Sequence, residues 1–217
     1  MLKALLFDLD GTLANTDPIH QAVWQEVLQP YGYEVTESFY QQRISGRLNE
    51  DIVHDLLPQL FPEQEPQFSA AKEARFRELA AQRLAPLAGL LPLLHWGQQQ
   101  KLAMAVVTNA PRDNAEFMLQ TLTLSDRFEQ VILAAELPRG KPDPLPYQEA
   151  LRLLEIGAEE AVVFEDSTTG VRSAVAAGIT TIGVATTYSA EVLYSLGATL
   201  VVPDFTDERI QQLGLMA

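Results

Sequence analysis

Two aspartates follow a short apolar run near the N-terminus, within the stretch LLFDLDGTL at positions 5–13. The apolar run at 4–7 has no polar alternation, which is typical of a strand buried on both faces of a parallel sheet. Asp8 and Asp10 would point to the same side of an extended chain, and Gly11 permits the positive φ of a sharp exit. Ligands of open α/β sheets bind at the carboxyl ends of the strands. The pair therefore predicts an Mg²⁺-assisted site with one acid as nucleophile; an acidic turn is the alternative.

Three more predicted strand ends carry polar side chains that could join this pair. Apolar runs at 102–108, 131–134 and 161–164 predict strands, and the polar residues at or after their ends are Thr108-Asn109, Lys141 and Glu165-Asp166. If the strands are parallel, all these ends lie at one edge of the sheet. There they supply a carboxylate nucleophile, hydroxyl and amide donors, one cation and a distal acid pair for a metal. Phosphoryl transfer needs this set, in which one carboxylate attacks and a second acid protonates the leaving oxygen.

The elements that position these residues alternate between helix and strand after position 86. Helical patterns at 111–122, 144–154 and 168–177 separate the strands, and two further strands are predicted at 181–184 and 199–202. Such alternation predicts an α/β fold with a doubly wound parallel sheet, which the strand at 4–7 must join. Gly170 lies inside the helix at 168–177, where glycine is unfavourable, and a close approach of this helix to the sheet would explain it.

Residues 15–85 contain helical patterns and no convincing strand. The patterns cover 17–29, 36–61 with breaks at 45–46 and 58, and 69–83, while FPEQEPQF at 61–68 is interpreted as a polar turn. We therefore predict a discontinuous α/β core domain, 1–14 and 86–217, and an all-helical cap domain, 15–85, that is inserted over the strand ends.

Composition excludes several classes of function. The chain has 217 residues, with 15 basic and 29 acidic side chains, and this net charge of −14 opposes binding to nucleic acid or to an anionic membrane. It has no cysteine, which excludes a thiolate nucleophile and a cysteine-based zinc site. No apolar run approaches the roughly 18 residues of a membrane span, and acids interrupt the N-terminus before a signal peptide could form. We expect a soluble cytoplasmic protein that is a monomer.

The motifs DLDGTL, VVTNA, GKPDP and FEDS, in this order, resemble those of the haloacid dehalogenase superfamily. The resemblance covers nearly the whole chain. Within the superfamily, the chain resembles the helical-cap subgroup of phosphatases and β-phosphoglucomutase-like enzymes. This resemblance implies a Rossmann-like core, Mg²⁺ as cofactor and an aspartyl-phosphate intermediate. It implies that Asp8 is the nucleophile and a metal ligand, and that Asp10 is the acid/base with its backbone carbonyl on the metal. Asp166 and Glu165 would also stand at the metal, and Thr108 and Lys141 would bind the phosphoryl group. The amides near Leu9, Asn109 and Ala110 would complete the phosphate cradle.

The resemblance also points to four residues of the cap. His20 stands at a spacing after the two aspartates that cap-bearing relatives share; a packing or surface histidine is the alternative. Arg47 follows Gly46 and would line the cap over the site. The mutase pattern has an arginine three residues after this glycine, where the present chain has Asn49. Lys72 resembles a cap position that some relatives use near substrate, or a Schiff-base lysine of the phosphonatase branch, whereas an exposed helix lysine is the alternative that the sequence favours.

These observations together predict an Mg²⁺-dependent phosphatase acting on a small phosphorylated metabolite, such as a sugar phosphate. Asp10 argues against the dehalogenase branch, which lacks a second aspartate because C–halide cleavage needs no acid for the leaving group. A β-phosphoglucomutase-like phosphosugar mutase is the alternative, and Asn49 argues against it. A catalytically inactive interaction module that keeps the fold is a third alternative.

Overall fold

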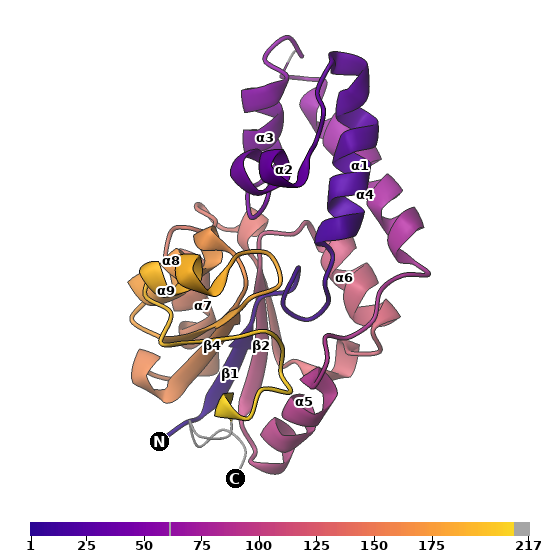
Figure 1. Cartoon of the computed structure of the whole chain (residues 1–217). Helices are drawn as coiled ribbons and strands as arrows, with labels where there is room; N and C mark the ends of the chain where they lie inside the picture. The colour runs from indigo at the N-terminus through magenta and orange to yellow at the C-terminus, as the bar shows by residue number, and fades with distance from the viewer. Residues whose placement is uncertain (61, 211–217) are drawn as a thin grey trace.

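A parallel sheet forms the centre of the core domain (Figure 1). In the computed structural model, which describes residues 1–60 and 62–210, six strands follow the order β3-β2-β1-β4-β5-β6. The strands are β1 (Ala4–Phe7), β2 (Ala103–Thr108), β3 (Gln130–Leu133), β4 (Ala161–Glu165), β5 (Thr180–Val184) and β6 (Leu200–Val202). β1 pairs with β2 and β4, and Leu6 is aligned with Ala105 on one side and Val163 on the other. The six predicted strands are all present, and their observed ends lie within one residue of the prediction.

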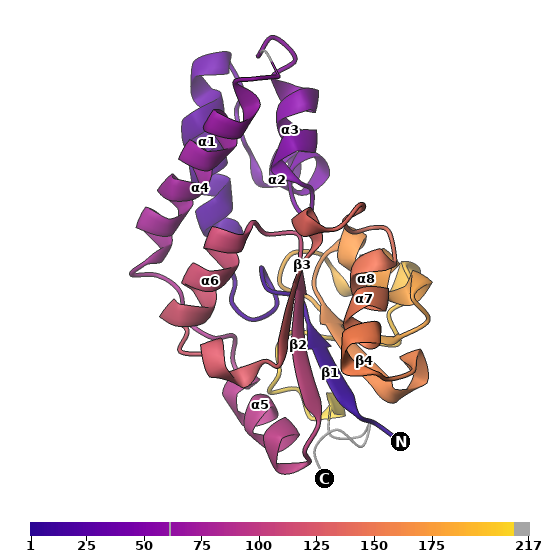
Figure 2. The same ribbon diagram turned by 180° about the vertical axis from the view of Figure 1, so that it is seen from behind.

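Helices cover both faces of the sheet, because successive side chains of its strands point in opposite directions. Leu5 and Phe7 belong to the apolar cluster under α5 (Leu90–Gln99) and α6 (Arg112–Thr121). Leu6 packs on the opposite face, against α7 (Leu145–Leu154) and α8 (Thr168–Ala176). Figures 1 and 2 show the same two helical layers from opposite sides. The predicted doubly wound α/β architecture is confirmed.

A helical cap is inserted between β1 and α5, above the carboxyl ends of the strands (Figure 1). Its helices are α1 (Asp17–Leu28), α2 (Glu37–Arg43), α3 (Asn49–Leu56) and α4 (Glu65–Ala80). The cap has an apolar core of its own, in which Trp24, Tyr40 and Ile52 are buried together. This cluster is distinct from those of the sheet, although Ile19 of α1 and Phe76 of α4 belong to the cluster under α5 and α6 and so join the cap to the core.

One prediction about the helices was wrong, and one helix was not predicted. The stretch FPEQEPQF is not a turn throughout, since α4 begins at Glu65 and Pro66 occupies its first turn, a place where proline costs no hydrogen bond; Phe61 lies outside the described residues. The short helix α9 (Ala190–Ser195) was not predicted. The Ser189 hydroxyl accepts a hydrogen bond from the amide of Val192, which caps this helix at its start.

Short 3-10 turns complete the described chain: η1 (Gln29–Tyr31), η2 (Ser125–Arg127), η3 (Ala134–Glu136) and η4 (Ala158–Glu160). The predicted domain boundaries after residues 14 and 85 stay predictions. Among the described helices, none has the length and apolar character that crossing a membrane requires.

Candidate active site

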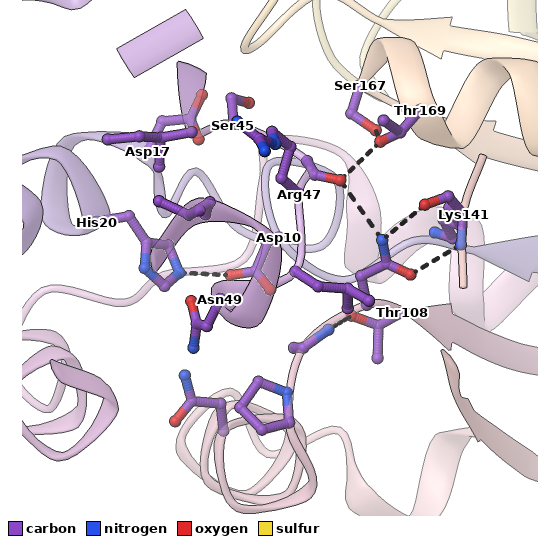
Figure 3. A pocket seen from close by; sticks show the side chains of 18 of the residues that line it. Asp10, Asp17, His20, Ser45, Arg47, Asn49, Thr108, Lys141, Ser167 and Thr169 are labelled. Carbon is purple, nitrogen blue, oxygen red and sulfur yellow. Dashed lines mark hydrogen bonds and ion pairs between the residues drawn. The ribbon is translucent and has the colours of Figure 1, made fainter. Parts of the chain in front are cut away.

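The strand ends and the cap together enclose a cavity of about 300 Å³. Core and cap side chains face each other across it in Figure 3, with Lys141 and Thr108 on one side and His20 and Asn49 on the other. Of the site residues predicted from the sequence, the cavity brings together Asp8, Asp10, His20, Arg47, Asn49, Lys72, Thr108, Asn109, Ala110, Lys141 and Asp166. Leu9 and Glu165 do not line it and are fully buried beside it.

The ammonium group of Lys141 connects three strand ends. Its Nζ donates to Oδ1 of Asp8 at 2.6 Å, to Oε1 of Glu165 at 2.5 Å and to the carbonyl oxygen of Val107 at 2.7 Å. Burial alone would lower the pKa of Lys141, but the charges of Asp8 and Glu165 outweigh it and raise that pKa. Lys141 is therefore a permanent cation at the point where β1, β2 and β4 end.

Three buried carboxylates gather around this lysine. Asp8, Glu165 and Asp166 each bring one oxygen to within 4.8 Å of the others. Burial raises the pKa of Asp8 to about 8; Lys141 opposes this rise, and the nearby carboxylates of Glu165 and Asp10 add to it. Burial, followed by the charges of Asp8, Asp17 and Glu165, also raises the pKa of Asp166 well above its ordinary value. The raised pKa values reflect the burial of these acids and the repulsion among them, which a hard divalent cation would relieve, and the carboxylate oxygens fit the ligand preference of such a cation.

Glu165 is held from below the cavity. Its Oε1 accepts a second hydrogen bond from the hydroxyl of Tyr147 at 2.7 Å, and its Oε2 accepts one from the hydroxyl of Ser167 at 3.2 Å. The carboxylate lies directly against Gly170, where an added Cβ would stand 1.9 Å from Glu165 Cδ. The close approach predicted for Gly170 is thus an approach to a charged side chain, and only glycine leaves room for it.

Asp166 is fixed by hydroxyl groups and by the turn after β1. The hydroxyl of Thr187 donates to its Oδ2, and the hydroxyl of Thr12 lies 3.5 Å from its Oδ1. Gly11 has φ of 78°, the positive value predicted from the sequence, and an added Cβ there would stand 2.0 Å from Oδ2 of Asp166. The turn therefore needs glycine for its backbone conformation and for the space that Asp166 occupies.

Asp10 lies apart from the three clustered acids and turns toward the cap. Its Oδ1 accepts a hydrogen bond from the hydroxyl of Thr16 at 2.8 Å, and Nε2 of His20 lies 3.2 Å from the same oxygen (Figure 3). The ring of His20 stacks on Phe76 with 3.9 Å between ring centres. The two aspartates that are close in sequence therefore have different surroundings, one among acids and a lysine and the other among hydrogen-bond donors.

The predicted phosphate cradle contains two residues with contacts of their own. The amide of Ala110 donates to the hydroxyl oxygen of Thr108 at 2.9 Å. The side chain of Asn109 accepts from the amide of Lys141 at 3.1 Å and also reaches the carbonyl oxygen of Gly46 at 3.4 Å. Asn109 thereby ties the loop that carries Lys141 to the cap.

The cap residues are all engaged within the protein. Lys72 is 2 % exposed, so its interpretation as an exposed helix lysine was wrong. Its Nζ donates to Oε1 of Glu73 at 2.8 Å, lies 3.1 Å from Nδ1 of His20 and stands over the ring of Trp24. The Lys72 side chain is thus covered by the ring of Trp24 instead of by solvent. The position of Lys72 within its helix does not reveal this burial, because Trp24 belongs to another helix.

Arg47 and Asn49 have partners in the cap as well. The guanidinium of Arg47 donates to Oδ2 of Asp55 at 2.9 Å and to the backbone oxygens of Arg43 and Asp51. The side-chain amide of Asn49 donates to Oε1 of Glu73 at 2.6 Å.

Several residues of the site were missed from the sequence. Tyr147 and Thr187 lie far along the chain from the acids that they contact, and a hydroxyl residue alone carries no signal of its role. Glu73 and Asn114 meet where cap helix α4 packs against core helix α6, with Asn114 Nδ2 2.6 Å from Glu73 Oε2. Glu73 sits beside Lys72 in a charged helix, and only the packing of α4 shows that both face inward.

Comparisons with known proteins agree with this geometry. The chain matches the family described as haloacid dehalogenase-like hydrolase over residues 5–184. It is 33 % identical, over 99 % of both chains, to validoxylamine A 7'-phosphate phosphatase of Streptomyces hygroscopicus subsp. limoneus. It is 28 % identical to the phosphorylated carbohydrates phosphatase of Thermotoga maritima, over 82 % of both chains. The crystal structure of CbbY from Rhodobacter sphaeroides in complex with phosphate superimposes with a TM-score of 0.85, at 26 % identity and over 96 % of both chains.

The match to the family covers more than half of the chain, and the first of these relatives aligns along nearly its full length. The chain therefore belongs to the haloacid dehalogenase-like hydrolases, in the subgroup of phosphatases and β-phosphoglucomutase-like enzymes.

Proposed function

We propose that this hydrolase is an Mg²⁺-dependent phosphatase that hydrolyses a small phosphorylated metabolite through an aspartyl-phosphate intermediate on Asp8. The observation that carries the proposal is the contact of Lys141 with both Asp8 and Glu165, beside Asp166 and beneath the cap. The family membership supports the coarser statement, that the chain is an enzyme that hydrolyses phosphoric monoesters.

The metal would be held by Asp8 and Asp166, with Glu165 beside them and the backbone carbonyl of Asp10 as a further ligand. These oxygens are hard donors, and a bound cation would relieve the repulsion among the clustered carboxyl groups. When bound, Mg²⁺ would neutralise charge on the phosphoryl group and on the attacking carboxylate. Both oxygens of Glu165 already accept hydrogen bonds, so we assign to Glu165 the positioning of Lys141 as its main task.

Asp8 is the proposed nucleophile. Its Oδ1 is held by Lys141, which leaves Oδ2 to attack phosphorus in line with the leaving oxygen. The Lys141 ammonium and the hydroxyl of Thr108 would bind phosphoryl oxygens, because both line the cavity next to Asp8. The product of the first step is a phosphorylated Asp8 and a free alcohol.

Asp10 is the proposed general acid and base. In the first step its carboxylic acid gives a proton to the leaving alkoxide, and in the second its carboxylate takes a proton from the water that attacks the aspartyl-phosphate. Asp10 lines the same cavity as Asp8 but is held by Thr16 and His20 instead of by Lys141. This separation lets one acid bond to phosphorus while the other exchanges protons.

The substrate class follows from the relatives and from the cavity. The similar proteins from Streptomyces and Thermotoga are named as phosphatases of validoxylamine A 7'-phosphate and of phosphorylated carbohydrates. A cavity of about 300 Å³ lined by acids, amides and a histidine suits a small hydroxylated ester. We therefore propose a sugar phosphate or a compound of similar size and polarity.

The test is the substitution Asp8→Asn with p-nitrophenyl phosphate as substrate. We expect release of nitrophenol to fall to the level without enzyme, and we expect ³²P from a labelled ester to be trapped on the parent but not on the variant after acid quench. Asp126→Asn, at an exposed position of η2, is the matched control and should be fully active. Turnover by Asp8→Asn at the parent rate would exclude the proposed nucleophile.

A further inference from the structure

We infer that the part of the cavity beyond the phosphoryl site selects an uncharged, hydroxyl-bearing leaving group, and that Glu73 determines this selectivity by occupying Lys72. The inference rests on the proposed phosphatase function and deepens it. It concerns the half of the cavity formed by α1, α3 and α4 of the cap, where His20 contacts Asp10 and where Lys72, Glu73 and Asn49 have no part in the chemistry proposed above.

Glu73 is the centre of a buried polar cluster in this half. Its Oε1 accepts from Lys72 at 2.8 Å and from Asn49 at 2.6 Å, and its Oε2 accepts from Asn114 at 2.6 Å. Burial would raise the pKa of Glu73, but the charge of Lys72, the neighbouring His20 ring and the hydrogen bonds from Lys72 and Asn49 outweigh it and lower that pKa to about 2. Glu73 is thus ionised at neutral pH, and its charge cancels the one cation that α4 brings to the cavity lining among the described residues.

Arg47 is the other cap residue that could attract an anion. Its guanidinium donates to the carboxylate of Asp55 and to two backbone oxygens of the cap, so its charge and three of its hydrogen bonds are already used. A second anionic group on the leaving group would have to displace one of these ion pairs, at Arg47 or at Lys72, in order to bind.

The balance of charge in the lining points the same way. Among the described residues that line the cavity, six carboxyl groups stand against three lysine and arginine side chains, one of which is Lys141 at the phosphoryl site. The phosphoryl group itself adds negative charge, and one divalent metal offsets only part of the total. A leaving group with a carboxylate or a second phosphate would therefore meet uncompensated repulsion, whereas hydroxyl groups can donate to these carboxylates.

Asn49 and Asn114 supply the remaining recognition. The Nδ2 groups of both are directed at Glu73, so Glu73 fixes the orientation of the two amides. The carbonyl oxygen of Asn49 is then an acceptor for a hydroxyl, since amide oxygens offer two lone pairs. Asn114 lies on α6 of the core and binds Arg77 of α4 at 2.7 Å, so the same cluster joins the cap to the core.

The experiment compares two phosphate esters of equal length that differ at one end. Sorbitol 6-phosphate has a neutral leaving group, and 6-phosphogluconate carries a carboxylate where sorbitol has CH₂OH. We expect kcat/KM for phosphate release by the parent to be at least about tenfold higher with the neutral ester. In Glu73→Gln the Lys72 ammonium is released, and this preference should fall by about tenfold. Glu78→Gln, on the exposed side of α4 and paired with Arg75, is the matched control and should keep the parent preference.

A second variant keeps the test decisive if Glu73→Gln does not fold. Lys72→Met removes the cation and leaves the Glu73 carboxylate, so its preference for the neutral ester should be equal to or greater than that of the parent. A parent that prefers 6-phosphogluconate, or a Lys72→Met variant whose preference moves toward 6-phosphogluconate, would overturn the inference. Hydrolysis of p-nitrophenyl phosphate separates the two proposals. If the parent does not hydrolyse this ester, the proposed phosphatase function is contradicted. If the parent hydrolyses it but prefers 6-phosphogluconate to sorbitol 6-phosphate, only the role of Glu73 is contradicted.

Discussion

His20 holds the carboxylate of Asp10 from the cap side, with 3.2 Å between Nε2 of the ring and Oδ1 of the acid. The other ring nitrogen, Nδ1, lies 3.1 Å from the Nζ of Lys72. The Lys72 ammonium is ion-paired with Glu73 and has only hydrogens to offer, so Nδ1 accepts and Nε2 carries the hydrogen that is donated to Asp10. The tautomer of His20 is therefore set by the cap, and through it the cap determines how Asp10 is oriented.

Removing this contact should slow the chemical step. We expect His20→Phe, which keeps the stacking on Phe76, to lower kcat for p-nitrophenyl phosphate by about tenfold or more with little change in KM, because a hydrogen bond to a charged group is worth about 1.5–3 kcal/mol. Asp10→Asn should lower kcat by about 10²–10⁴-fold. In the Asp10→Asn background His20→Phe should have little further effect. Equal effects of His20→Phe in both backgrounds would contradict a role through Asp10.

Metal binding should be visible in stability as well as in activity. We expect EDTA to abolish hydrolysis and Mg²⁺ to restore it, and we expect Mg²⁺ to raise Tm, since a ligand at 100 times its Kd stabilises the folded state by about 2.7 kcal/mol. Asp166→Asn removes one of the three clustered carboxylates and should lose most of the Mg²⁺-dependent rise in Tm measured by calorimetry. An unchanged response of this variant to Mg²⁺ would place the metal elsewhere.

Gly170→Ala should destabilise the protein, although glycine to alanine inside a helix ordinarily stabilises by about 1 kcal/mol. The new Cβ would stand 1.9 Å from Cδ of Glu165 and force that buried carboxylate or the helix to move. We expect a loss of about 1–3 kcal/mol in urea unfolding, together with a loss of activity as Lys141 loses its partner. Arg172→Ala, at an exposed position of the same helix, is the control and should unfold near the parent midpoint. A Gly170→Ala variant as stable as the control would contradict the crowding argument.

Acid should destabilise the cluster around Glu73. The pKa of Glu73 is lowered in the folded protein to about 2 from an ordinary 4.5, so its ionised form is favoured by folding. Its contribution is fully present above about pH 4.5 and is lost as the pH falls toward 2; from the shift it is on the order of 3 kcal/mol. The free energy of unfolding of Glu73→Gln should therefore fall less steeply than that of the parent between pH 5 and pH 3, as measured by urea titrations. Parallel pH profiles of the two proteins would contradict the depressed pKa.

The core of the molecule could be predicted because each strand carries its information locally. An unbroken apolar run such as 4–7 is typical of a strand that is buried on both faces. The parallel arrangement of such strands then brings Asp8, Thr108 and Asp166 to one edge of the sheet, independently of the conformation of the connecting loops. The positive φ at Gly11 is likewise a local requirement of the turn. The start of α4 could not be placed in this way, because the polar residues around Pro66 suit a turn as well as a first helical turn.

The sequence by itself determined the fold class, the edge of the sheet where the chemistry takes place and the kinds of side chain found there, because strand patterns and strand-end residues are local properties. Only the tertiary structure decided the partners of these residues: Lys141 between Asp8 and Glu165, His20 on Asp10, and Lys72 buried against Glu73. The contacts of Lys141 join residues far apart in the chain, and the ion pair of the neighbours Lys72 and Glu73 is buried only because α4 packs against α1 and α6, so both depend on the folded arrangement of the elements.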